Sequence, residues 1–155
     1  MDILSTDWFE QLEIALTVLI AAVLGGLVGF ERELMKKSAG LRTHAILSAA
    51  AALLVGVGNS LVEHFTTETS PGLLRTDPIR IVEAIVTGVA FLGAGTIFRH
   101  HGEGENIEGL TTAASLLLVA GIGITVALGQ MLLAGLITLL SLVILHIVKK
   151  LDQRK

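Results

Sequence analysis

The stretch from Leu110 to Val148 contains 39 residues and not one Asp, Glu, Lys or Arg. A helix that crosses a bilayer once needs about 20 apolar residues, so this stretch is long enough for two crossings. Gly129 and Gln130 provide a short turn between two antiparallel helices. Such a run has no place in a small water-soluble domain, and it predicts an integral membrane protein.

The rest of the chain is built in the same way. Its composition is 52% hydrophobic and 16% charged, well below the roughly 25% charged residues of a soluble protein. The apolar runs are continuous rather than alternating, which favours helices. We therefore predict an all-α fold, a compact bundle of five transmembrane helices in one domain over residues 1–155. The expected spans are 11–30, 43–62, 79–98, 110–128 and 130–148.

Basic residues indicate how the bundle is oriented. Nine of them fall in connections on one expected side: Arg32, Lys36, Lys37, Arg42, Arg99, Lys149, Lys150, Arg154 and Lys155. The other side has only Arg75 and Arg80. Because basic loops stay in the cytoplasm, we expect the N-terminus outside and the C-terminus in the cytoplasm. No Lys or Arg precedes the first span, so no cleavable signal peptide is predicted.

Several kinds of function find no support in the sequence. The absence of cysteine excludes disulfides and thiol catalysis, and no basic stripe interleaved with aromatics points to nucleic acid. No nucleophile–base arrangement can be assembled, so neither an enzyme nor a cofactor is predicted. His100 and His101 could bind a metal ion, but they lie in a glycine-bearing loop without preformed geometry, and no metal site is assigned.

Two groups of charged residues lie at expected membrane edges, where charges are costly. On the cytoplasmic side the first span ends and the second begins with a polar group of five: Glu31, Arg32, Arg42, Thr43 and His44. It forms either a functional polar site or an interfacial set of mutually paired charges. On the outer side Asp77, Arg80 and Glu83 are spaced so that both acids flank the arginine on a helix. Asp77 before Pro78 also predicts a helix start.

Small residues recur within the spans at intervals that allow close helix contact. They are Gly25 and Gly29 in the first span and Gly88, Gly93 and Gly95 in the third. They are interpreted as an oligomer seam or as packing within one subunit. Thr111 and Thr112 open the fourth span, where capping of the helix by hydroxyl groups is favoured over contact with a ligand.

Three groups of motifs occur in order along the chain. They are GLVGFERE at 26–33 with AGLRTH at 39–44, DPIR at 77–80 with TGVAFLGAG at 87–95, and GLTTAA at 109–114. Together they resemble the signatures of the MgtC/SapB family of bacterial inner-membrane proteins. Many members of that family continue into a cytoplasmic ACT-type domain, and a chain that ends at residue 155 resembles the short form.

The resemblance implies a role in adaptation to low magnesium or other stress, without catalytic activity. Family members are linked to virulence and are thought to restrain the F-type ATP synthase. Our leading hypothesis is a regulatory protein of the bilayer, a homo-oligomer that acts on a partner such as the F-type ATP synthase. The alternative is a small oligomeric ion transporter or channel. It would be gated by Glu31, Arg42 and His44 on the cytoplasmic side and by Asp77, Arg80 and Glu83 on the outer side.

Overall fold

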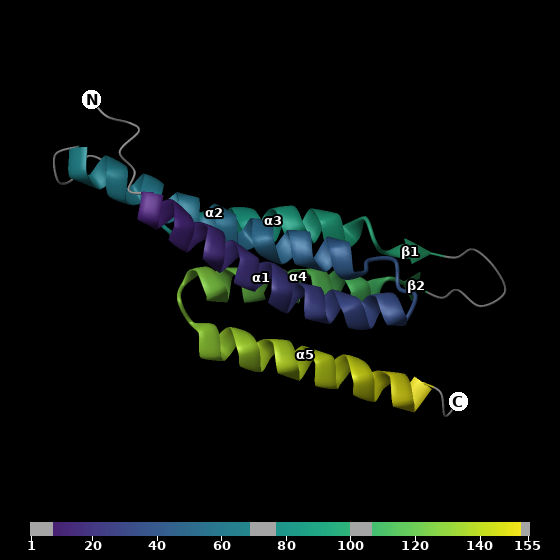
Figure 1. The fold of residues 1–155 in the computed structure, drawn as a ribbon. Coiled ribbons are helices and arrows are strands. Elements are labelled where there is room, and N and C mark those ends of the chain that lie inside the picture. The colour runs from purple at the N-terminus through teal and green to yellow at the C-terminus, as the bar shows by residue number, and fades with distance from the viewer. Residues whose placement is uncertain (1–7, 69–76, 100–106, 153–155) are drawn as a thin grey trace.

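The computed structural model describes residues 8–68, 77–99 and 107–152. These residues form five helices and one short strand pair (Figure 1). The helices are α1 (Trp8–Leu34), α2 (Leu41–Glu68), α3 (Ile79–Ala94), α4 (Leu110–Ala127) and α5 (Met131–Asp152). Strands β1 (Phe98–Arg99) and β2 (Ile107–Glu108) pair antiparallel between α3 and α4. The prediction of five helices is confirmed.

Three helices are long and apolar enough to cross a bilayer, namely those over Trp8–Leu34, Leu41–Glu63 and Leu110–Ala127. Helix α3 has 16 residues, which at the rise of an α-helix span about 24 Å, less than the roughly 30 Å of a hydrocarbon core. The apolar part of α5, Met131–His146, is also short. The described chain therefore contains three helices that qualify as spans.

Helix α3 ends four residues before the predicted limit of 79–98. The backbone turns at Gly95 and Thr96, where the Thr96 N–H donates to the Gly93 carbonyl at 3.0 Å. Glycine is a poor helix former, so the segment after Ala94 leaves the helix readily. Phe98 then pairs with Glu108 across the strand pair. The connection between α3 and α4 thus contains a short strand near each of its ends, where the sequence predicted only a loop.

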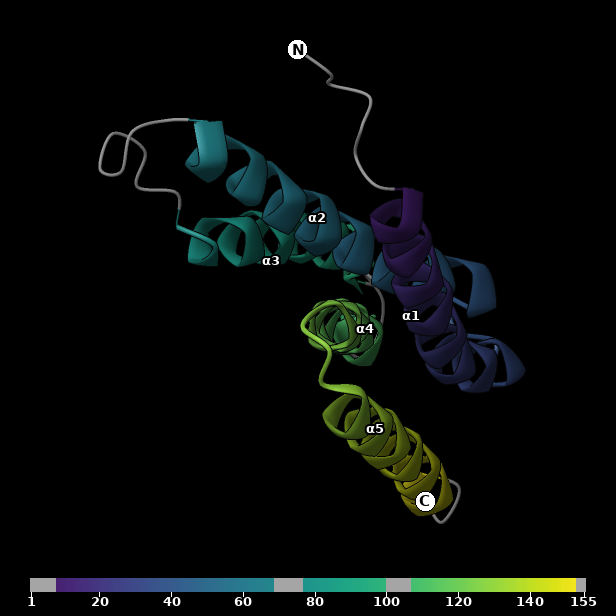
Figure 2. The ribbon, with the colours of Figure 1, turned by 60° about the vertical axis from the view of Figure 1, so that its left-hand side comes forward.

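Helix α4 lies at the centre of the arrangement (Figure 2) and contacts each of the other four helices. Helices α1 and α2 form the most extensive pair. The core is aliphatic, and its fully buried members include Val28 of α1, Ala52 of α2 and Val119, Ile122 and Val126 of α4. Small residues at these contacts let helix backbones approach closely, as they do in membrane bundles.

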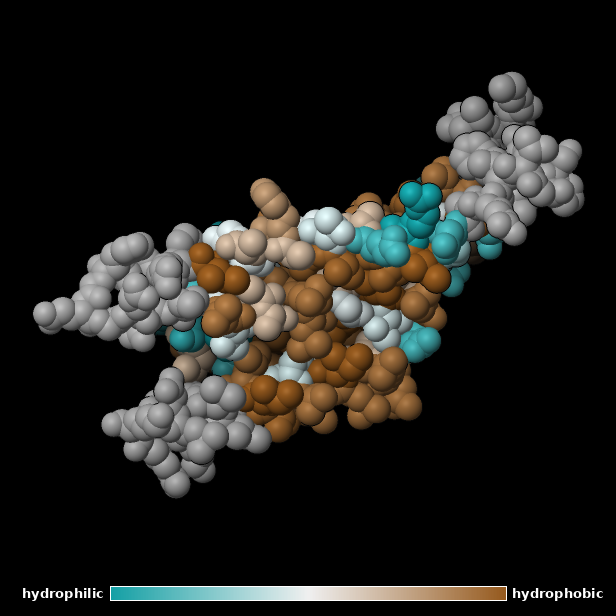
Figure 3. All heavy atoms as spheres, turned by 180° about the vertical axis from the view of Figure 1, so that it is seen from behind, coloured by the Kyte–Doolittle hydropathy of each residue, from teal (hydrophilic) through white to brown (hydrophobic). Residues whose placement is uncertain are grey.

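The outer surface is apolar. Leu16, Leu19, Leu132, Leu136 and Leu139 are each more than half exposed. Figure 3 shows hydrophobic residues over the middle of one face and hydrophilic residues toward its ends. Water-soluble proteins do not expose continuous apolar surface of this extent. The chain is a membrane protein, and lipid is the solvent that this surface fits.

Candidate functional site: a buried polar cluster

Three helix ends meet at one end of the molecule and bring buried polar side chains together. Arg32 lies in the last turn of α1 and His44 in the first turn of α2. Thr112 and Ser115 lie in the first turns of α4. His44, Ser115 and Thr112 are each 4% exposed or less, as is Arg32. We call these four residues the buried polar cluster.

His44 is the centre of the cluster, and both of its ring nitrogens are hydrogen-bonded. Nδ1 lies 2.9 Å from the carbonyl oxygen of Gly40. A carbonyl oxygen only accepts, so Nδ1 carries a proton and donates it. Nε2 lies 3.0 Å from the hydroxyl oxygen of Ser115. The ring therefore joins the start of α2 to α4.

The Ser115 hydroxyl has two acceptors within reach but only one proton. Its oxygen is 2.8 Å from the Thr112 carbonyl and 3.0 Å from His44 Nε2. When the imidazole is neutral, Nε2 accepts the proton of Ser115. When the imidazole is charged, Nε2 donates to Ser115, which then donates to the Thr112 carbonyl. The protonation of His44 and the orientation of the Ser115 hydroxyl are thus coupled.

Charged groups lie beside this network without full compensation. Arg32 Nη1 is 3.7 Å from Glu31 Oε2, and both side chains are largely buried. Among the described residues, three buried polar atoms have no hydrogen-bond partner: Glu31 Oε2, Arg32 Nε and Ser48 Oγ. A buried polar group without a partner costs about 1–3 kcal/mol, and more if charged. The cluster is therefore an expensive feature of an otherwise apolar bundle.

Glycines allow the helices around the cluster to approach. A Cβ atom on Gly25 would lie 2.5 Å from Ser48 Cβ, and one on Gly29 would lie 2.7 Å from the Gly40 carbonyl oxygen. On α4, a Cβ on Gly123 would lie 2.1 Å from the Ser48 carbonyl oxygen. Gly25 and Gly29 thus pack against α2 of the same chain. Gly123 completes the contact from the other side.

The glycines of α3 have different surroundings. A Cβ on Gly93 would make an ordinary contact with Ala113 Cβ, at 3.4 Å. One on Gly95 would meet the carbonyl oxygen of Leu92, and one on Gly88 would have no atom within 4 Å. Of the three, Gly93 lies at the contact with α4, whereas Gly88 borders open space.

The structure brings together only part of the predicted cytoplasmic group. Arg32 and His44 are buried and Glu31 pairs with Arg32, whereas Arg42 and Thr43 are exposed on α2. The carboxylate of Glu33 accepts a hydrogen bond from the Leu41 N–H at 2.9 Å and so caps the start of α2. Neither this cap nor the place of Ser115 beside His44 was predicted.

The prediction that the hydroxyl group of Thr111 or Thr112 caps α4 is wrong. The N-cap is Gly109 with φ +92°, and no side chain caps the helix. The threonines already lie inside the helix, where a side chain is past the N-cap position. Thr112 contributes its carbonyl oxygen to the cluster instead, and Thr111 is exposed.

The predicted outer group lies at the start of α3, where Asp77 precedes the helix and Arg80 and Glu83 lie in its first two turns. Asp77 Oδ1 accepts from the Ile79 N–H at 3.0 Å, but the N-cap is Pro78 rather than the predicted Asp77. Asp77, Arg80 and Glu83 are exposed, and no ion pair joins them in the described part of the chain. His100 and His101 lie outside the described residues, and among the described ones no group of three or more acidic or histidine side chains could hold a metal ion.

A second polar site lies at the opposite end of α1 and α2 and was not predicted. The Ser60 hydroxyl donates a hydrogen bond to the carboxylate of Glu10. Together with Glu13, Thr17 and Asn59 they line a cavity of about 250 Å³. Serine and glutamate 50 residues apart carry no local pattern, so only the packing of α1 on α2 reveals them.

Comparisons with a family model and with individual proteins identify the same family. The MgtC family matches residues 18–154. Protein MgtC of Salmonella typhimurium is 44% identical over 115 residues, which cover 74% of this chain and 43% of that protein. An uncharacterised protein of Haemophilus influenzae is 38% identical over 134 residues, 86% of this chain and 55% of that protein.

A third relative carries a name that mentions a substrate. The putative magnesium transporter YhiD of Escherichia coli is 36% identical over 137 residues, which cover 86% of this chain and 61% of that protein. The chain thus spans about half the length of the curated relatives it matches. No solved structure matches.

Proposed function

This chain belongs to the MgtC family, and from that premise we propose that it is a regulatory inner-membrane protein that acts on a membrane partner during magnesium limitation or stress. In this proposal it has no catalytic activity and works as a homo-oligomer. The F-type ATP synthase is the partner that the family resemblance favours. All five helices cross or enter the bilayer, with the N-terminus outside and the C-terminus in the cytoplasm.

The buried polar cluster is the observation that carries the proposal. Arg32 and His44 are charged or chargeable groups that lie inside an apolar bundle, where such groups are costly and usually serve a function. Both lie at helix ends, and His44 is held by α2 and α4 together. A change in the protonation of His44 would reverse the direction of its hydrogen bond to Ser115, and a change in what His44 contacts would act on the starts of α2 and α4 together. That property suits a protein that reports a condition to a partner.

The centre of the bundle supports regulation over transport. Between the cluster and the cavity near Glu10 lies a fully buried aliphatic layer that includes Val28, Val119, Ile122 and Val126. An ion that crossed this layer would lose its hydration without gaining polar ligands, which costs many kcal/mol. Within a single chain, the described residues offer no polar route from one end to the other.

Transport is the second candidate, and two observations favour it. The relative YhiD is named a putative magnesium transporter. The chain also has polar groups at both ends of α1 and α2, around His44 and around Glu10. A path between them would have to form by helix movement or between subunits.

Growth of a bacterial strain that lacks its own MgtC-family proteins tests the role of the cluster. Plasmid-borne Arg32→Gln and His44→Gln should fail to restore growth at limiting magnesium, because each leaves buried partners uncompensated. Arg42→Gln and Lys36→Gln change exposed residues nearby and should restore it. Membrane abundance of each variant is measured by immunoblot. Equal behaviour of all four variants at equal abundance would refute a role for the cluster.

A further inference from the structure

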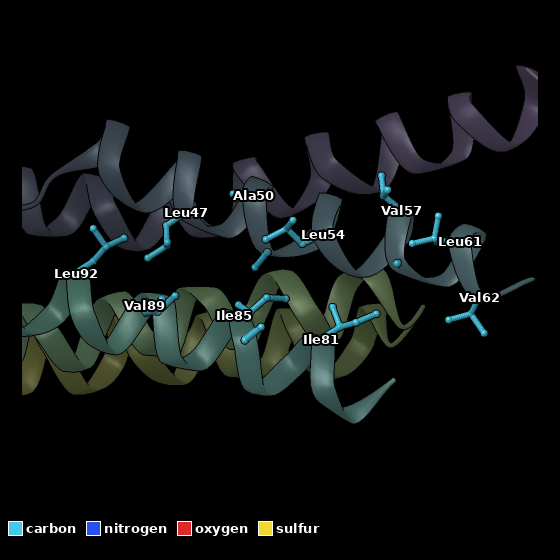
Figure 4. A pocket seen from close by; sticks show the side chains of 14 residues that line it. Leu47, Ala50, Leu54, Val57, Leu61, Val62, Ile81, Ile85, Val89 and Leu92 are labelled. Carbon is cyan, nitrogen blue, oxygen red and sulfur yellow. The ribbon is translucent and has the colours of Figure 1, made fainter. Parts of the chain in front are cut away.

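A long apolar groove separates α2 from α3 and belongs to neither polar site. Its volume is about 610 Å³, and its lining side chains are all aliphatic, apart from glycines. Side chains of both helices point into it, including Leu47 and Leu54 of α2 and Ile81 and Leu92 of α3 (Figure 4). A Cβ on Gly88 would meet no atom within 4 Å, so α3 presents open space there.

The groove is longer than one leaflet of a bilayer and shorter than the whole hydrocarbon core. It extends from Ile81 to Leu92 along α3 and from Leu47 to Val62 along α2, which at the helical rise is about 16 Å and about 22 Å. One leaflet contributes about 15 Å of a core of about 30 Å. The two helices touch at the outer end, where Gly58 contacts Ile81. The lining offers no side chain that can form a hydrogen bond, which suits an acyl chain.

Charges at the outer end of the groove identify the headgroup. Arg80 lies one turn before Ala84 and two turns before Gly88, and these two line the groove. Its side chain is exposed, and no described carboxylate pairs with it. Asp77, also exposed, precedes it at the same end, and only one of its carboxylate oxygens is engaged with the Ile79 N–H. A cation and an anion therefore lie together at this end of the groove, and Glu83, a second exposed carboxylate, follows Arg80 by three residues on α3.

We propose that the groove between α2 and α3 binds one acyl chain of a zwitterionic phospholipid, with its phosphate on Arg80 and its amine beside Asp77. Arginine is well suited to phosphate, with which it forms charge-assisted hydrogen bonds. Phosphatidylethanolamine carries both required charges. An anionic headgroup such as phosphatidylglycerol would satisfy Arg80 but would meet the uncompensated carboxylate of Asp77. The site rests on the insertion of α2 and α3 in the bilayer that is proposed above, but not on regulation or transport.

Native mass spectrometry of the detergent-purified chain tests the proposal. After delipidation, equal amounts of phosphatidylethanolamine and phosphatidylglycerol are added. We expect one phosphatidylethanolamine per chain. Arg80→Gln should weaken its retention about tenfold, the equivalent of one hydrogen bond to a charged group. Gly88→Leu should abolish retention by filling the groove, and circular dichroism checks that it folds.

Ala90→Leu is the matched control, because Ala90 is exposed on the opposite side of α3; it should retain the lipid. Equal retention by Gly88→Leu and Ala90→Leu would overturn the site. Equal retention of the two lipids, with no effect of Arg80→Gln, would overturn the headgroup assignment and the proposal with it. A dimer or a co-purified protein that Gly88→Leu releases would show that the groove is a protein interface instead.

Discussion

Replacing Gly123 with alanine tests the contact that places Ser48 beside the buried polar cluster. The added Cβ would lie 2.1 Å from the Ser48 carbonyl oxygen and 3.1 Å from Ala51 Cβ. Cβ atoms are essentially never found within 3.0 Å of a non-bonded heavy atom. Helices α4 and α2 must therefore separate by roughly 0.9 Å where they cross. The obstructing atom is the backbone carbonyl oxygen of Ser48, so no side-chain rotation can relieve the clash.

The expected cost is the difference of two effects. Overpacking of this kind costs about 1–3 kcal/mol, and alanine regains up to about 1 kcal/mol over glycine in a helix. We expect a net loss of about 1 kcal/mol in the free energy of unfolding. The assay is titration with dodecyl sulfate in mixed micelles, followed by far-ultraviolet circular dichroism.

Gly121→Ala provides the control on the same helix, two residues away, because its Cβ would meet no atom within 4 Å. It should leave stability unchanged or raise it slightly through helix propensity. Equal unfolding free energies for the two variants would refute the close contact between α4 and the Ser48 backbone. A lower stability of Gly121→Ala alone would refute it as well.

Two further predictions concern the backbone and the topology. Gly109→Ala should lower the free energy of unfolding far more than Gly129→Ala in the same titration. Both glycines have positive φ, which costs alanine about 1 kcal/mol. Only at Gly109 would the Cβ also collide with another atom, the Thr96 carbonyl oxygen at 1.9 Å. Equal losses would mean that the turn before α4 is not crowded. Reporter fusions after Lys37 and Lys150 should read cytoplasmic and a fusion near Thr69 external, since basic connections stay inside; a cytoplasmic signal at Thr69 would contradict five crossings.

The helices were predictable because the apolar runs are long and are bounded by charged residues or, between the last two, by Gly129 and Gln130. The sequence of the first run does not show where α1 ends, because Glu31, Arg32 and Glu33 continue it as a helix to Leu34. Their orientation follows from helix phase. Arg32 lies three residues after Gly29 and seven after Gly25, so it shares the face that packs on α2. The spacing of Arg32 from these two glycines therefore predicts that Arg32 lies at the contact with α2.

The partners of His44 were harder to predict. Ser48 lies one turn after it, and the i, i+4 spacing places both on the buried face of α2. Ser115 is 71 residues away, and only the position of α4 against α2 brings it to Nε2. Arg42 could not be separated from Arg32 by charge alone; its exposure depends on how α2 begins after the turn at Lys36, whose φ is +53°.

Magnesium flux into liposomes that contain the purified chain tests the central claim, regulation rather than transport, most directly. A fluorescent indicator inside the vesicles reports the entry of magnesium after an inward-directed magnesium gradient is applied. The buried aliphatic layer around Ile122 predicts a rate no higher than in protein-free vesicles. Reproducible flux that rises with the amount of protein and is lost in His44→Gln would contradict the account and establish transport.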